Sequence, residues 1–139
     1  PGAVQIYYGD ENDRGWGPGK STSDSMQGSR GLYQWGANPT VLAHWQKVGK
    51  FRNSHIAVGA GMQTDLGSNT YGRTYNKNGV QDKVVINIGG SGSVSVNVSG
   101  IFADGTSVRN AYDGATGTVA SGKVTFTASN GVILIEENK

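Results

Sequence analysis

Hydrophobic and polar residues alternate with a period of two through most of the chain after residue 61, which is typical of half-buried β-strands. Turn signals that end in Gly, such as Asn78-Gly79 and Asn130-Gly131, separate the alternating runs. Short strands divided by such turns predict an antiparallel β-sandwich with Greek-key connections. The expected strands are residues 69–76, 83–88, 93–98, 106–112, 123–128 and 132–136, with a short one over 118–120.

The first residues of the chain follow a different pattern. Residues 3–8 form a nearly continuous apolar run, which is typical of a parallel strand that is covered on both faces. A strand of this kind needs a neighbour on each side, and no earlier strand precedes it in the sequence. We therefore expect residues 3–8 to complete a larger sheet, and the chain to be the tail end of a larger enzyme.

A helix is predicted to follow a long loop. Asn38 has the side chain of an N-cap, and Pro39 suits the first helical position. Apolar residues then recur at helical spacing between Val41 and Val48, so one face of the helix is expected to be buried. The helix is expected to end near residues 53–55, before a Gly-rich stretch.

Composition and charge exclude several classes of protein. The formal net charge is +2 without a clustered basic tract, which argues against nucleic acid as a partner. The absence of Cys excludes disulfides and thiolate metal sites, and no apolar run approaches the ~18 residues of a membrane helix. Neither His44 nor His55 has a partner at metal or triad spacing, so both are interpreted as structural and no metal site is expected.

Several stretches in fixed order resemble the C-terminal part of α-amylases of glycoside hydrolase family thirteen. They are residues 2–11, similar to the eighth barrel strand; Ser29-Arg30 and Trp35, similar to the loop that follows; residues 44–61, similar to the last barrel helix; and the strands of residues 73–136. The resemblance implies a mainly β chain in two parts. Residues 1–61 would be the last βα unit of an incomplete (β/α)8 catalytic barrel, and residues 62–139 a C-terminal antiparallel Greek-key β-sandwich.

The resemblance also implies a function. The parent enzyme would hydrolyse internal α-1,4-glucosidic bonds of starch or related glucans with retention, which requires two carboxyl groups about 5–5.5 Å apart. In the family these groups come from barrel strands upstream of Pro1, so no catalytic residue is expected here and the chain alone is expected to be inactive. Its expected partners are the remainder of the barrel and the α-glucan substrate, with no membrane. Calcium is expected only in the complete enzyme, and a secreted or periplasmic location is expected.

The loop of residues 10–37 carries the candidate substrate-binding residues. Loops of this length are usually functional or disordered, and a barrel would place this one at the face where active sites are built. Arg30 matches a family position that contacts glucose units, and Trp16 offers an aromatic face to a sugar ring. Asp24 completes the candidate set; in the alternative interpretation, Arg30 pairs with an acidic loop residue such as Asp24 and only fixes the loop.

A second hypothesis is a non-catalytic carbohydrate-binding or structural β-sandwich module. In that case the sandwich would hold a glucan on Tyr71, Tyr75 and Tyr112. Each of these side chains suits a packed cross-strand position equally well. Exposure of the three rings in the folded chain therefore bears directly on this alternative.

Overall fold

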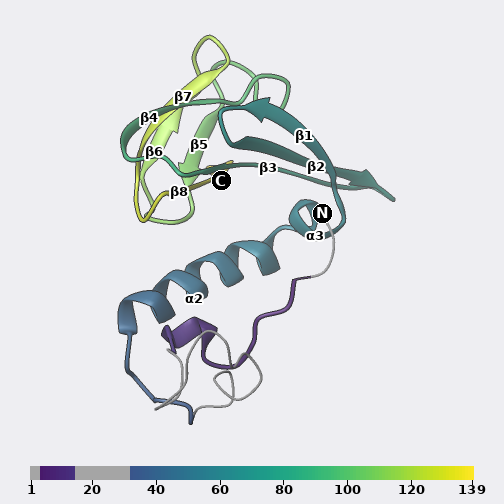
Figure 1. Ribbon diagram of the computed structural model, residues 1–139. Helices are drawn as coiled ribbons and strands as arrows, with labels where there is room; N and C mark the ends of the chain where they lie inside the picture. Colours follow the sequence, from purple (N-terminus) through teal and green to yellow (C-terminus); the bar gives the residue numbers. More distant parts are fainter. Residues whose placement is uncertain (1–3, 15–31) are drawn as a thin grey trace. The chain divides into compact units, whose positions relative to one another are not determined.

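The computed structural model describes residues 4–14 and 32–139. The chain divides into two compact units, Gly2–Gln46 and Lys47–Lys139, the second of which contains the β-strands (Figure 1). None of the helices within the described residues has the length and apolar character needed to cross a membrane.

In the first unit, the strand expected over residues 3–8 is not formed within the described residues 4–8. Val4 and Ile6 are 65% and 50% exposed, and the segment leads into a short 3-10 helix, η1 (Asp10–Asn12). The strand prediction is wrong here for a physical reason. A parallel strand is stable only between neighbours that bond its backbone and cover both its faces, and none of the described strands pairs with residues 4–8.

Helix α2 (Pro39–Ser54) begins and ends where the sequence predicts. The Asn38 Oδ1 atom accepts a hydrogen bond from the Val41 amide at 3.1 Å, which confirms Asn38 as the N-cap. A second short helix, α3 (Ile56–Ala60), follows immediately and was not predicted. Its sequence is short and contains Gly59, so local propensity alone gives little sign of a helix.

The rest of the second unit consists of antiparallel sheets, which confirms the predicted mainly β class with a sandwich. Six strands form one sheet in the order β1-β2-β3-β8-β5-β6, and β4 pairs with β7 in a second sheet. Among the strands of the described residues, only β1 has no counterpart among the expected strands. This edge strand is almost entirely exposed and has an irregular register between Asp65 and Gly67, so its sequence lacks the alternation of apolar and polar residues. The strands are β1 (Met62–Gly67), β2 (Thr70–Lys77), β3 (Val80–Ile88), β4 (Gly92–Asn97), β5 (Ser107–Asn110), β6 (Thr116–Thr118), β7 (Lys123–Ala128) and β8 (Val132–Glu137).

The hairpin between β2 and β3 shows how the turn signals operate. Asn78 and Gly79 have φ angles of 55° and 77°, the left-handed conformation that a tight two-residue hairpin requires at both positions. Asn and Gly tolerate this conformation better than other residues. The turn therefore fixes the register in which Lys77 pairs with Val80 and Tyr75 with Asp82.

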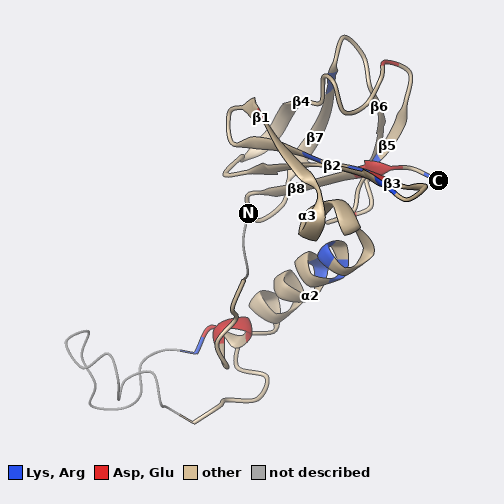
Figure 2. Ribbon diagram, turned by 90° about the vertical axis from the view of Figure 1, so that its right-hand side faces the viewer, with Lys and Arg blue, Asp and Glu red and all other residues tan. Residues whose placement is uncertain are grey.

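The six-stranded sheet is covered on both faces. On one face, Val85, Val108 and Ile135 pack into a core with Val96 and Phe126 of the small sheet. On the other face, a second cluster joins Val84 and Leu134 to Phe51 of α2 and Val58 of α3. The end of α2 and α3 thus cover one face of the large sheet, and the small sheet covers the other (Figures 1 and 2).

Arg73 of β2 anchors α3 to the sheet. Its buried guanidinium donates to the carbonyl oxygens of Ala57 and Val58 at 3.1 and 2.9 Å, and to Gln63 Oε1 at 3.2 Å. The positive charge also lies at the C-terminal end of the helix, where the helix dipole favours a cation. Charge and hydrogen bonding therefore fix the place of α3 on β2.

Candidate functional site

The three candidate substrate-binding residues, Arg30, Trp16 and Asp24, lie outside the described residues. Their assignment stays a prediction. The structure does describe both ends of the loop that carries them. Near the C-terminal end of this loop, Tyr33 and Trp35 form an edge-to-face ring contact with centroids 4.6 Å apart, and Trp35 is exposed.

Asn12 holds the two ends of this loop together. Its buried amide nitrogen donates to the Gln34 carbonyl, and its Oδ1 atom accepts from the Asn38 amide at 3.0 Å. The Asn38 side chain donates in turn to Asp13 Oδ2 at 3.1 Å. The residues before and after the loop are therefore joined at the start of α2, so the base of the loop is defined.

The acidic residues at the base of the loop have structural partners. Glu11 Oε2 accepts from the Gly9 amide at 3.0 Å, and Asp10 Oδ2 accepts from the Tyr7 amide at 3.0 Å. A hydrogen bond from its own amide, with further bonds from Tyr33 and Gly9, lowers the pKa of Glu11 in spite of burial. Burial and the neighbouring Glu11 raise the pKa of Tyr33. These contacts keep Glu11 ionised as a hydrogen-bond acceptor.

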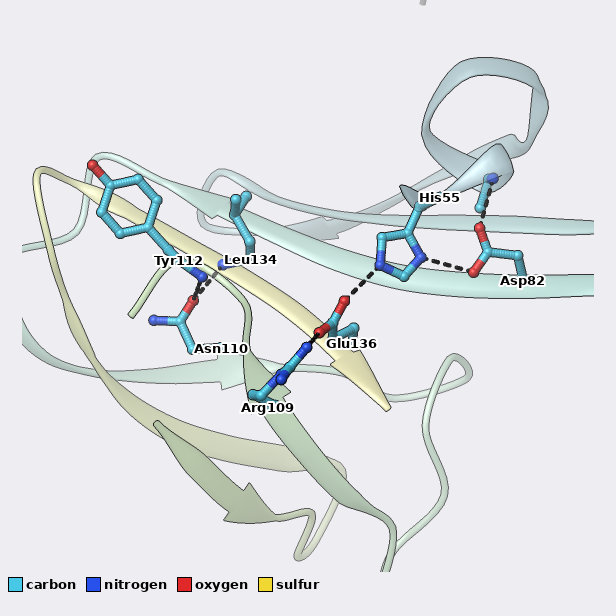
Figure 3. A network of polar contacts seen from close by, with 8 residues as sticks. His55, Asp82, Arg109, Asn110, Tyr112, Leu134 and Glu136 are labelled. Carbon is cyan, nitrogen blue, oxygen red and sulfur yellow. Dashed lines mark hydrogen bonds and ion pairs between the residues drawn. The ribbon is translucent and has the colours of Figure 1, made fainter. Parts of the chain in front are cut away.

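The second unit contains a polar network centred on His55, between α2 and α3 (Figure 3). His55 Nδ1 lies 2.9 Å from Asp82 Oδ1 of β3, and His55 Nε2 lies 2.7 Å from Glu136 Oε2 of β8. Arg109 of β5 donates to the other Glu136 oxygen, from Nε at 2.9 Å and also from Nη2. We call these four residues the His55 bridge.

Burial and charge make the His55 bridge more than a surface contact. The side chains of His55, Asp82 and Glu136 are only 13%, 18% and 12% exposed. Carboxylates accept hydrogen bonds and do not donate them, whereas a protonated imidazole donates from both ring nitrogens. The imidazolium form of His55 therefore satisfies Asp82 and Glu136 at once.

Both carboxyl groups of the His55 bridge have lowered pKa values. Burial raises the pKa of Asp82, but the hydrogen bonds from the Ala57 amide, at 2.9 Å, and from His55 outweigh it. Burial likewise raises the pKa of Glu136, and the hydrogen bonds and positive charges of Arg109 and His55 outweigh that effect. The folded state thus stabilises two carboxylate anions beside the junction of α2 and α3.

His55 has no partner at metal or triad spacing in the sequence, but the fold gives it two carboxylate partners from distant strands. Its partners lie 27 and 81 residues further along the chain, so sequence spacing could not reveal them. One signal was present in the strands. Asp82 and Glu136 occupy alternate positions on the same faces as Val84 and Leu134, where an apolar residue would otherwise pack against a helix.

The four groups of the His55 bridge satisfy one another, which makes the network a structural connection between α2, α3 and three strands. Among residues 4–14 and 32–139, no group of His, Cys, Asp or Glu side chains is arranged to hold a metal ion.

Comparison with known proteins relates the chain to starch-degrading enzymes. Over 70 residues, which are 48% of this chain and 10% of the relative, it is 50% identical to the periplasmic α-amylase of Escherichia coli strain K12. The chain is related to α-amylases. An amylopullulanase of Thermoanaerobacter thermohydrosulfuricus is 30% identical over 155 residues, which cover 99% of this chain and 10% of the relative. The chain thus spans about a tenth of the length of these curated relatives.

Solved structures show the same fold. The α-amylase of Anoxybacillus matches 82% of this chain and 26% of its own with a TM-score of 0.62 and 19% identity. The Geobacillus thermoleovorans α-amylase, solved with acarbose, matches 82% of this chain and 27% of its own with a TM-score of 0.60 and 16% identity. No protein-family model matches the chain. The expected membership of glycoside hydrolase family thirteen therefore stays a prediction.

Proposed function

We propose that this chain is the C-terminal part of an α-amylase of glycoside hydrolase family thirteen, which hydrolyses internal α-1,4-glucosidic bonds of starch or related glucans with retention. The observation that carries the proposal is the 50% identity with a periplasmic α-amylase over 70 residues. The alignment of nearly the whole chain with an amylopullulanase supports it. The same relative supports a periplasmic or secreted location as part of this proposal.

In this proposal the chain supplies a loop on the substrate side and a stabilising domain. The parent barrel would supply the catalytic carboxyl groups and any calcium site. Exposed apolar side chains support this division. Val4 and Ile6 are 65% and 50% exposed, and Tyr7 and Tyr8 are also exposed. Exposed apolar runs mark surfaces that partners cover, and in this proposal the remainder of the barrel would cover this one.

The alternative of a carbohydrate-binding module on Tyr71, Tyr75 and Tyr112 loses one of its residues. Tyr112 is 2% exposed and packs with Phe51, Val84 and Leu134. Its ring therefore offers no face to a glucan. Tyr71 and Tyr75 are partly exposed, and only they remain for this alternative.

A chimera tests the proposed function. The 70-residue segment of the Escherichia coli periplasmic α-amylase that matches this chain is replaced by the matching residues of this chain, and release of reducing ends from soluble starch is measured. We expect hydrolysis by the chimera, products of retained anomeric configuration by NMR, and no hydrolysis by the 139-residue chain alone.

The matched control is the host enzyme truncated at the graft point, which should be inactive. Two results contradict the proposal. One is a chimera that folds, by circular dichroism, yet is no more active than the truncated host. The other is starch hydrolysis by the isolated chain.

A further inference from the structure

A cavity of about 650 Å³ lies beside the His55 bridge, within the second unit. Its floor includes Tyr75 and Asp82, which are directly paired across β2 and β3, and the Arg109 and Glu136 pair of β5 and β8. These residues extend the face of the large sheet that carries α3. The volume falls within the range of about 300–1,000 Å³ that is typical of ligand sites.

Charged groups of both signs line the cavity in similar number. Three carboxyl groups, three Lys or Arg side chains and the His55 ring line it, and Figure 2 shows acidic and basic segments close together near β3 and β5. An anion or a cation would meet like charges beside opposite ones, so neither sign of ligand charge gains a clear attraction. The lining therefore favours a neutral polar ligand. The charged lining residues, besides His55, are Asp82, Lys83, Arg109, Glu136, Glu137 and Lys139.

The floor of the cavity retains hydrogen-bonding capacity in fixed positions. The Asp82 carboxylate accepts from His55, from the Ala57 amide and from the Lys83 amide, so one of its four lone pairs remains. Arg109 binds Glu136 through Nε and Nη2, and its Nη1 group has no bond recorded within the described residues. Because the His55 bridge holds these side chains in place, a ligand need not order them on binding.

Tyr75 adds an aromatic ring next to these polar groups. It is half-buried and lies opposite Asp82 in the register of the hairpin. A sugar presents hydroxyl groups along its edge, which donate to carboxylates and accept from Arg, and an apolar C–H face, which packs on an aromatic ring. The amides of Asn76 and Gln81 at the rim are both donors and acceptors, as hydroxyl-rich ligands require.

We propose that the cavity over β2, β3, β5 and β8 binds a short neutral α-glucan. The choice of an α-linked glucan rests on the proposed function, whereas the preference for a neutral oligosaccharide rests on the lining. The Tyr75 ring carries one sugar face, and Asp82 and Arg109 bind its hydroxyl groups.

The test is a titration of the full ¹⁵N-labelled chain with maltotetraose, followed by backbone amide shifts. We expect saturable shifts at Asn76, Gln81 and Glu137. The Tyr75→Ala variant should weaken affinity by about fivefold to tenfold, as loss of one aromatic contact predicts. Tyr71→Ala is the matched control, because Tyr71 lies on the same face of the same strand but does not line the cavity; its affinity should stay within about twofold of the parent.

Mapping on the unmodified chain needs no variant, so it decides the question even if Tyr75→Ala fails to fold. Absence of saturable shifts, or shifts confined to other residues, overturns the site. Equal affinity for cellotetraose overturns its assignment to α-glucan. If the chimera is active but the chain does not bind maltotetraose, the cavity site is wrong and the proposed function stands. If the chain binds maltotetraose but the chimera is inactive, the cavity site stands and the proposed function is wrong.

Discussion

Removal of the His55 side chain is the sharpest test of how the second unit is held together. His55→Ala leaves Asp82 and Glu136 without their shared donor, because His55 joins both carboxyl groups at 2.9 and 2.7 Å. Hydrogen bonds to charged groups contribute about 1.5–3 kcal/mol each, and a buried carboxylate without a partner costs desolvation energy as well. Arg109 remains bound to Glu136, and the Ala57 amide remains bound to Asp82.

These remaining partners, and the residual exposure of 18% and 12% of the two carboxylate side chains, reduce the loss. We expect the free energy of unfolding to fall by about 2–3 kcal/mol, rather than the sum of two full bonds. At about 4 °C per kcal/mol for a chain of this size, the midpoint of thermal unfolding should drop by about 8–12 °C.

A double-mutant cycle separates the bridge from simple loss of packing, since His55 also contacts the Phe51 ring at 4.7 Å between centroids. The cycle combines His55→Ala with Asp82→Asn and measures urea unfolding by circular dichroism. We expect a coupling energy of about 1–2 kcal/mol, because the two residues bond directly. Glu137→Gln is the control: this neighbour of Glu136 is exposed, and its change should stay within about 0.5 kcal/mol.

Two results would refute the reasoning. If His55→Ala changes stability by less than about 0.5 kcal/mol, solvent replaces the bridge without cost. If the single changes at His55 and Asp82 are additive, the hydrogen bond between them contributes nothing to folding.

Other parts of the fold give further expectations. The pKa values of Asp82 and Glu136 are lower in the folded chain than in the unfolded chain, where they lie near 4, so both groups stabilise the fold above that pH. The free energy of unfolding should therefore fall as pH drops below about 5. Urea unfolding midpoints measured between about pH 3 and 7 should depend less on pH in the Asp82→Asn/Glu136→Gln variant. Gly61→Ala places a Cβ 2.5 and 2.6 Å from two backbone oxygens and should cost about 1–3 kcal/mol in thermal unfolding, while Gly59→Ala, with open space, should not destabilise. Asn12→Ala removes the side chain that accepts a hydrogen bond from the Asn38 amide, so hydrogen exchange of that amide should become at least about tenfold faster. Unchanged exchange would show that the Asn12 side chain is not needed to hold the two ends of the loop together.

Features set by local sequence were predictable. The N-cap at Asn38, the turn at Asn78-Gly79 and the strand alternation depend on neighbouring residues, and each is present. Features that depend on residues far apart in the sequence were not predictable. The His55 bridge joins positions up to 81 residues apart, and the strand expected over residues 3–8 depends on neighbours that the described chain does not supply.

The direction of the pKa shifts bears on where catalysis takes place. A retaining glycosidase needs one carboxyl group that stays protonated near neutral pH, and such a group has a raised pKa. Among the described residues, the carboxyl groups with displaced pKa values are Glu11, Asp82 and Glu136, and each is displaced downward. Hydrogen bonds that lower a pKa suit a permanent acceptor and oppose a general acid. The same bonds that stabilise this chain therefore make Glu11, Asp82 and Glu136 poor general acids and suit them to a structural role.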